Sequence, residues 1–238
     1  MKNIKIHIIT CILILLIGSP LFAQYENSNI AVSLNYSFIT SSKIYLSPNA
    51  QDPILRNQYA EMSGSKSYGI DIRFKISDPL IIGISSEYFK SPDNHTPLPV
   101  GGFLIDAIDN FTLIPVELTL YYHIPFSTEK FKFYMGGGAG LYFGRQSRTF
   151  SDVTTSDNGS ESAYGIHVCT GMEYIANEYI SLRAEMKFRD PEFNMKNKYS
   201  KQVFEYKGRP LLLPRESFET KANVDGIMFT VGLVFRLL

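Results

Sequence analysis

The chain has 238 residues, and its basic and acidic side chains are equal in number at 23 each, so its formal net charge is zero. A chain without a basic excess does not attract nucleic acid, and we set nucleic-acid binding aside. Because one of the two cysteines, Cys11, lies in a predicted leader, the mature chain keeps only Cys169 and cannot form an intramolecular disulfide.

Residues 1–23 are predicted to be a cleavable signal peptide. Lys2 and Lys5 give a positive start, residues 6–17 are almost wholly apolar, and the small residue Ala23 precedes the expected cut. A membrane anchor is the alternative, but the apolar run is shorter than the roughly 20 residues that a spanning helix needs. The mature chain, residues 24–238, has the length of one all-β domain.

Eight segments of the mature chain alternate apolar and polar side chains at period two, which is typical of strands with two unlike faces. In the clearest segment Tyr68, Ile70 and Ile72 share one face, and Asp71 and Arg73 share the other. In chain order the segments lie near 29–40, 68–76, 80–90, 111–123, 133–144, 163–174, 179–189 and 226–238. The chain ends inside the last segment, so we expect this strand to pair with the first and close a cylinder.

The connectors alternate strictly between long and short. The first long one is rich in Ser, Pro, Asn and Asp, which favour turns over regular ladders. The long connectors are 44–65, 91–110, 145–162 and 190–221, and the short ones are 77–79, 125–130 and 176–178. This alternation is typical of a transmembrane barrel with long external loops and short periplasmic turns.

Two strands carry residues that restrict their pairing. Pro115 has no N–H to donate, so the fourth strand is expected to have a bulge or a locally unpaired position there. Gly136, Gly138 and Gly140 share one face of the fifth strand, which suits a bend around a narrow lumen where side chains would collide. A phosphate-binding loop is the competing interpretation, but no Lys-Ser/Thr pair and no helix follow these glycines.

Charged side chains on the polar faces are expected to point into the barrel. Periodicity alone does not separate a soluble barrel from a membrane barrel, but the loop alternation and the small, charged polar faces favour a polar lumen. Buried charges persist when they are paired, so we predict ion-pair ladders across the lumen. The predicted inward charges are Arg73, Lys75, Arg183, Lys187, Arg236, Asp71, Glu87, Glu117, Glu173 and Glu185.

The predicted fold is therefore all-β: a single eight-stranded antiparallel up-and-down transmembrane β-barrel. The Tyr134–Tyr142 strand and the closing Val231–Leu238 segment resemble the outer-membrane β-barrel superfamily of Gram-negative bacteria, of the OmpA/OmpX/OmpW type. The resemblance implies a location in the cell outer membrane, contact with outer-membrane lipid and insertion by the barrel-assembly machinery. Such families typically end in an aromatic residue, whereas this chain has Leu238 there and Phe235 three residues earlier.

No catalytic, metal or cofactor site is predicted. The best candidate set for an enzyme is Ser91, Asp93 and His95 in the second long loop, as in barrels that modify lipid. The lumen-facing His123 and His167 are expected to join the hydrogen-bond network rather than bind metal, and Cys169 is not expected to form a zinc site with these distant histidines. Tyrosines near strand ends suit interfacial girdles, namely Tyr36, Tyr88, Tyr122, Tyr142 and Tyr174. The loop segment Leu211–Leu213 would bind a partner or fold over the barrel mouth.

The leading functional hypothesis is a non-enzymatic outer-membrane barrel with a structural or surface-interaction role through its long external loops, whose partner the sequence does not identify. Three alternatives stay open. They are a narrow, porin-like channel for small or hydrophobic molecules that leave through a gap in the wall, a soluble lipocalin-like binder, and a barrel-borne lipid-modifying enzyme.

Overall fold

The computed structural model describes residues 29–40, 43–45, 48–57, 59–61, 64–91, 94–157, 161–213, 218–224 and 226–237. The predicted leader of residues 1–23, Asp93 and Leu238 lie outside these described residues.

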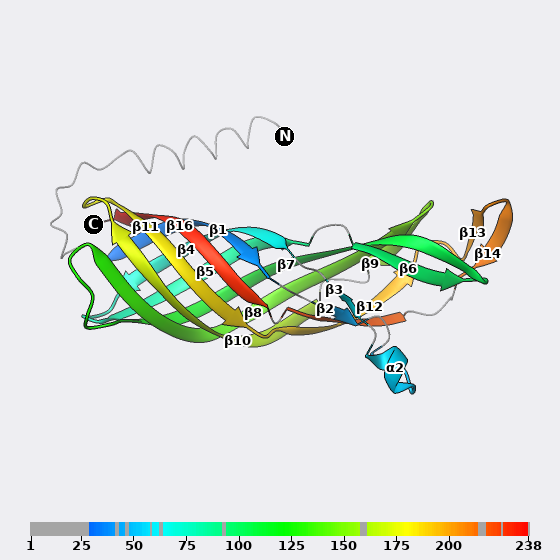
Figure 1. Ribbon diagram of the computed structural model, residues 1–238, viewed down its shortest axis with the longest axis horizontal. Helices are drawn as coiled ribbons and strands as arrows, with labels where there is room; N and C mark the ends of the chain where they lie inside the picture. Colours follow the sequence, from blue (N-terminus) through cyan, green and yellow to red (C-terminus); the bar gives the residue numbers. More distant parts are fainter. Residues whose placement is uncertain are drawn as a thin grey trace, which may run out of the picture.

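Eight antiparallel strands form a closed barrel, as the sequence predicts (Figure 1). Each strand pairs with the next, and the last pairs with the first over a register from Ile30↔Leu237 to Ile39↔Met228. In ring order the strands are β1 (Ile30–Ile39), β4 (Ser65–Lys75), β5 (Leu80–Lys90), β7 (Phe103–His123), β8 (Phe131–Phe150), β10 (Glu161–Ile175), β11 (Ile180–Arg189) and β16 (Ile227–Leu237).

Apolar side chains cover the outside of the barrel, and charged side chains lie inside it. Val116 and Leu182 are 43% and 54% exposed on the outer face, whereas their neighbours Glu117 and Arg183 are 2% and 4% exposed. A soluble lipocalin-like barrel would show the reverse arrangement, so this alternative is wrong. The barrel therefore presents an apolar surface suited to lipid.

The three short connectors lie together at one end of the barrel (Figure 1). They join β4 to β5, β7 to β8, and β10 to β11, as predicted. Beyond the opposite end, β7 and β8 continue past their predicted ends at residues 111 and 144.

Among the described residues, three of the four long connectors, 91–110, 145–162 and 190–221, are largely strands. The first, 44–65, has the turns that its composition predicts, together with two three-residue strands and a short helix. Together with the outer parts of β7 and β8 the long connectors form a β-rich projection beyond the barrel, here called the extension (Figure 1). It contains β2 (Lys43–Tyr45), β3 (Tyr59–Glu61), β6 (Asn94–Val100), β9 (Val153–Asp157), β12 (Glu192–Tyr199), β13 (Val203–Tyr206), β14 (Arg209–Leu212), β15 (Phe218–Asn223) and the short helix α2 (Pro53–Arg56). Among the described residues, no helix is long and apolar enough to cross a bilayer.

The β6–β7 hairpin explains how a segment rich in Pro and Gly forms strands. Its turn is Gly101–Gly102, both at positive φ (57° and 83°), which a two-residue type I′ hairpin requires. In such a hairpin alternate residues of β6 donate to β7, and the residues between them face the free edge. Pro97 and Pro99 occupy free-edge positions, where their missing N–H costs no hydrogen bond and blocks pairing with another strand.

Pro115 and Gly138 behave as the sequence predicts. The β5–β7 ladder is interrupted between the pairs Ser86↔Val116 and Phe89↔Leu113, which leaves Pro115 unpaired on that side. A Cβ on Gly138 would overlap the carbonyl oxygen of Leu118 on the neighbouring strand. The barrel wall is therefore as tightly curved here as the glycine pattern indicates.

Candidate functional site

Ten charged side chains from six barrel strands meet inside the barrel, and we call this group the ionic lumen. Nine of them belong to the predicted inward set. The tenth, Arg189, was missed although it continues the period-two face of Arg183 and Lys187. The members are Asp71, Arg73, Glu87, Glu117, Glu173, Arg183, Glu185, Lys187, Arg189 and Arg236.

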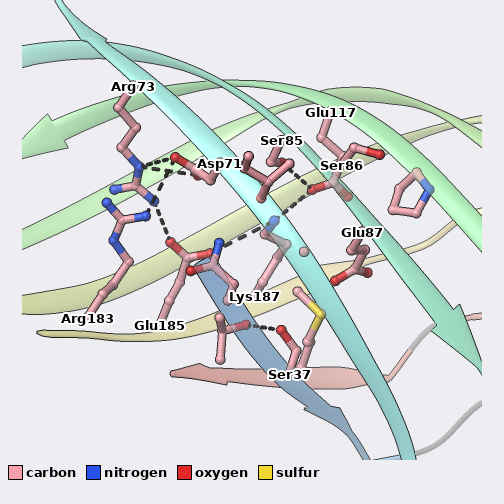
Figure 2. Close-up of a pocket in the computed structure, with 16 residues that line it drawn as sticks. Ser37, Asp71, Arg73, Ser85, Ser86, Glu87, Glu117, Arg183, Glu185 and Lys187 are labelled. Atoms are coloured by element: carbon pink, nitrogen blue, oxygen red, sulfur yellow. Dashed lines mark hydrogen bonds and ion pairs between the residues drawn. The ribbon is translucent and has the colours of Figure 1, made fainter. Parts of the chain in front are cut away.

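Arg73 is the centre of the ionic lumen (Figure 2). Its Nε lies 3.0 Å from Asp71 Oδ1, and its guanidinium also donates to Glu185 Oε2 at 2.9 Å. The guanidinium carbon lies 3.6 Å from the centre of the Tyr121 ring, which adds a cation–π contact. The hydroxyls of Tyr121 and Tyr134 donate to Asp71 and Glu185 at 3.1 and 2.8 Å. Both carboxylates are therefore bound from two sides.

At the long-loop end of the ionic lumen, the side chains are arranged around Glu117. The Lys187 ammonium donates to Glu117 Oε2 at 2.6 Å, and the Tyr142 hydroxyl donates to Oε1 at 2.9 Å. Arg189 donates to Glu87 and lies 3.7 Å from Glu117. These contacts join β5, β7, β8 and β11 across the lumen.

Arg183 connects the centre with the short-turn end. It donates to Ser33 at 2.9 Å and to Glu173 at 3.4 Å, and it lies 3.5 Å from Asp71. Arg236 donates to the second oxygen of Glu173. The predicted ladders of ion pairs across the lumen are therefore confirmed.

Lys75 is the one residue of the predicted inward set that does not belong to the ionic lumen. Its ammonium lies 2.9 Å from Asp78 in the adjacent short turn, where the Asp78 side chain is 85% exposed. The hydrogen bond and charge of Lys75 lower the pKa of the Asp78 carboxyl below its ordinary value of 3.8.

The ionic lumen is electrically balanced and almost filled. Its five cations and five carboxylates cancel in formal charge. The cavity between them has a volume of about 20 Å³, with Asn35, Asp71, Arg73, Glu117 and Lys187 among the lining residues (Figure 2). Such a volume holds about one water molecule.

An apolar cluster lies at the long-loop end of the ionic lumen, and we call it the apolar plug. It joins inward side chains from the barrel strands to residues of the first strands of the extension. Phe111 contacts both Phe89 and Phe193 edge to face, at ring-centre distances of 6.2 and 5.9 Å. The plug consists of Ile39, Phe89, Phe111, Leu113, Tyr142, Ala163, Phe193, Met195, Ala222, Val224 and Met228.

The extension has a buried polar layer and then a second apolar cluster. Arg148 binds both oxygens of Asp109, at 2.8 and 2.9 Å, and Gln146 links Asp109 to Thr220. The second cluster, here called the tip core, contains Ile105, Ala107, Phe150, Val153, Tyr199, Phe204, Leu211 and Leu213. The extension is therefore a packed unit with its own core.

The candidate catalytic set does not form a triad. Ser91 is buried, and its hydroxyl accepts a hydrogen bond from the Phe111 N–H at 2.9 Å. The His95 side chain is 63% exposed, and its Nδ1 lies 2.7 Å from Asp106 Oδ2. Asp93 lies outside the described residues. An exposed His–Asp pair is present, but its expected hydroxyl partner binds the backbone instead.

The other candidate residues are distributed as follows. His167 joins the lumen network as predicted, because its Nε2 lies 2.8 Å from Thr119 Oγ1. Cys169 is buried as a free thiol beside Tyr121 and Tyr134. In the described part of the chain, no three His, Cys, Asp or Glu side chains gather as a metal site.

The structure corrects the predicted tyrosine girdle at one position and places the Leu211–Leu213 segment. Tyr142 is not a girdle residue, because it points into the barrel and binds Glu117, whereas Tyr36, Tyr88 and Tyr122 are exposed on the outer face. Leu211 and Leu213 are buried in the tip core, so this segment packs within the extension rather than over the barrel mouth.

The barrel wall has an incomplete ladder between β10 and the segment that follows β11. The β10–β11 pairing ends at His167↔Arg189, and Pro191 follows shortly after. Among the described residues, 161–166 of β10 pair with β8 only, so their other edge carries no ladder. We call this gap in hydrogen bonding the seam. It lies beside the apolar plug, to which both Ala163 and Phe193 belong.

Comparisons with known proteins agree with this architecture. The family of the outer membrane protein beta-barrel domain matches residues 9–236. OprG from Pseudomonas aeruginosa is 14% identical, with 88% of this chain and 96% of OprG covered, at a TM-score of 0.61. Neisserial surface protein A is 16% identical, with coverages of 87% and 97% and a TM-score of 0.46. At these identities the likeness is one of fold. Among curated proteins, none matches the sequence.

Proposed function

Because the chain belongs to the outer membrane protein beta-barrel domain family and is an integral barrel of the cell outer membrane, we propose that it is a sealed, non-enzymatic anchor that presents the extension for surface contact. The closed ionic lumen supports the proposal that the barrel is a sealed anchor. The packed extension supports the presenting part, since it holds a fixed shape outside the membrane.

The observation that carries the proposal is the closure of the ionic lumen. Every acidic residue of the lumen has a cationic partner within 4 Å, and the remaining cavity is about the size of one water molecule. To conduct, the barrel would have to separate buried ion pairs, at several kcal/mol per uncompensated charge. A sealed barrel fits a structural role better than transport through the lumen.

Planar-bilayer recording tests the closure. We expect the folded mature chain to give no steady ion conductance, and the Glu117→Ala/Lys187→Ala variant, which removes a matched pair, to conduct measurably. Steady conductance of the unaltered chain would contradict the sealed lumen.

Cell-surface binding tests the contact role. A variant in which residues 202–213 are replaced by an Asn-Gly turn removes the β13–β14 hairpin, the part of the extension farthest from the barrel (Figure 1). Cells that display the unaltered chain should adhere to one another or to a test surface more strongly than cells with the shortened chain. Equal adhesion at equal surface amounts would count against this role.

The absence of catalysis is part of the proposal. It is supported by Ser91, whose hydroxyl is bound to the backbone, and by the exposure of the His95–Asp106 pair. Lipid turnover should be the same for the unaltered chain and for His95→Ala. A loss of turnover in His95→Ala would instead favour a lipid-modifying enzyme.

The seam favours a second candidate function, the passage of apolar molecules through the wall. It lacks ladder hydrogen bonds and borders the apolar plug, so it could part without breaking the ionic lumen. A Cβ on Gly165 would lie 3.5 Å from Pro191 Cα, so a Gly165→Cys/Pro191→Cys disulfide can be tested across the seam once the Tyr142 ring, 2.8 Å from that Cβ, moves aside. If the seam is a route, oxidation of this variant should stop uptake of an apolar dye, and reduction should restore it. Unchanged uptake would exclude the route.

A further inference from the structure

Two lysines face each other on the outer surface of the barrel. Lys66 of β4 and Lys90 of β5 are directly opposed in the antiparallel register, and both are exposed. Opposed residues in such a pair have Cβ atoms about 5 Å apart, and like charges there are destabilising. Among the described residues, no acidic side chain forms an ion pair with either lysine. We call these two residues the lysine pair.

Three lysines of the extension have an acidic partner. Lys196 lies 3.1 Å from Glu219, Lys201 lies 2.5 Å from Asp152, and Lys221 lies 2.8 Å from Glu192. The lysine pair differs from these three lysines, since its two ammonium groups are opposed to each other and have no acidic partner among the described residues. Two opposed ammonium groups repel each other, and an external anion bound between them would relieve this repulsion.

The height of the lysine pair on the barrel identifies the source of that anion. Lys66 is ten residues from Ile76, the apolar residue at the short-turn end of the same face. At about 3.3 Å per residue and a strand tilt of about 40°, this separation is roughly 25 Å along the membrane normal. An apolar barrel band is also about 25 Å tall, so the lysines lie at its outer edge, where lipid headgroups begin.

The side chains around the lysine pair suit the rest of a lipid. Tyr68 and Tyr88 lie two residues closer to the membrane centre, are opposed to each other, and are 67% and 51% exposed. Tyr36 packs on Tyr68 at a ring-centre distance of 5.3 Å, which extends this aromatic surface to β1. On the other side Thr112 is opposed to Lys90 and adds a hydroxyl. Acyl chains would lie along the apolar face below, with a phosphorylated headgroup above.

We propose that Lys66 and Lys90 bind the phosphate groups of a phosphorylated glycolipid of the outer leaflet, whose sugar and acyl chains contact the tyrosines below. This site is independent of the surface-contact role of the extension. Lysine binds phosphate as a point charge, and each lysine near a membrane surface contributes about a fivefold gain in affinity for anionic lipid.

Native mass spectrometry of the folded mature chain in neutral detergent tests the proposal, with bisphosphorylated lipid A as the probe. The Lys66→Gln/Lys90→Gln variant should bind the probe about 25-fold more weakly. The matched control, Lys196→Gln/Lys201→Gln, removes the same charge from the extension and should bind like the unaltered chain. The Lys66→Arg/Lys90→Arg variant should keep the binding.

Three outcomes of the comparison between variants and probes would overturn the proposal. These are undiminished binding in the glutamine variant, an equal loss in the control, and equal affinity of the unaltered chain for lipid A without phosphates. Displacement of the lipid by millimolar inorganic phosphate would also overturn it, since the site would then take an isolated anion. If the glutamine variant does not fold, as judged by gel mobility without heating, Lys90→Gln alone should still show a loss of about fivefold.

Discussion

The interior of the barrel and the interior of the extension lie along the same strands, yet they are filled with opposite kinds of side chain. In the barrel the inward residues of β8 contribute Tyr134 and Tyr142 to a charged network, and the outward residues are apolar up to Phe143. Beyond that point the outward positions become polar at Arg145, and an inward residue such as Phe150 enters an apolar core. The surroundings explain the difference, because lipid accepts apolar side chains outside the barrel whereas water requires them inside the extension.

The largest expected effect is the loss of a central lumen charge. Arg73→Ala would leave Asp71 and Glu185 buried without their main cation, and we expect a loss of about 3–5 kcal/mol in the free energy of unfolding. Because the chain has no tryptophan, the measurement is urea unfolding in lipid vesicles followed by far-UV circular dichroism. Lys75→Ala, which removes a cation paired with an exposed carboxylate, should cost at most about 1 kcal/mol. Equal losses in the two variants would contradict the central role of Arg73.

In the extension the corresponding change is the removal of an apolar side chain. Phe204 is buried in the tip core and contacts the Phe150 ring at 5.3 Å, so Phe204→Ala should cost about 3 kcal/mol of local stability. Limited proteolysis should cleave this variant in the extension while the barrel stays intact. Val203→Ala, a change at the exposed neighbour, should be cleaved no faster than the unaltered chain. Loss of the barrel together with the tip would mean that the two regions unfold as one.

The sequence predicts the barrel better than the extension, because the barrel strands alternate apolar and polar side chains at a period of two residues. A period of two assigns every residue of a strand to a face, so the inward position of Asp71, Glu117 and Arg183 could be predicted, and the same rule applied consistently would have included Arg189 and Tyr142. Which charge binds which was beyond sequence reasoning, because cross-lumen pairs such as Arg73–Glu185 depend on the stagger of the closed ring.

The extension was missed because its strands contain residues that usually mark turns. Signals were nevertheless present in the β6–β7 hairpin. Gly101–Gly102 is a type I′ turn sequence. Pro97 and Pro99 are two residues apart, so their backbone nitrogens lie on the same edge of the strand. The β12–β15 pairing could not be predicted in this way, since these strands are separated by the β13–β14 hairpin and meet only in the folded extension.

A third expected effect concerns association rather than stability. Pro97→Thr/Pro99→Thr would restore two N–H donors on the free edge of β6 and remove the block to strand pairing. The variant should form dimers or larger species in detergent that the unaltered chain does not form, as measured by light scattering after size exclusion. Leu104→Thr, on the partner strand opposite Pro99, makes a comparable surface change and should remain unassociated. Monomeric behaviour of the proline variant would show that the edge is protected by other means.

The smallest expected effect is at the short-turn end, where an ion pair is exposed to water. The hydrogen bond from Lys75 holds the pKa of Asp78 below 3.8 in the folded chain, so the pair stabilises the fold above that pH and this contribution is lost as the pH falls through the folded pKa. Solvent screening limits the contribution to at most about 1 kcal/mol, in contrast to the buried pairs of the ionic lumen. NMR titration of the Asp78 carboxyl should show its pKa rising towards 3.8 in Lys75→Gln, while the pKa of Asp152 at the other end, which is lowered by Lys201, stays unchanged. An unchanged Asp78 pKa in Lys75→Gln would mean that the turn itself, rather than the lysine, lowers it.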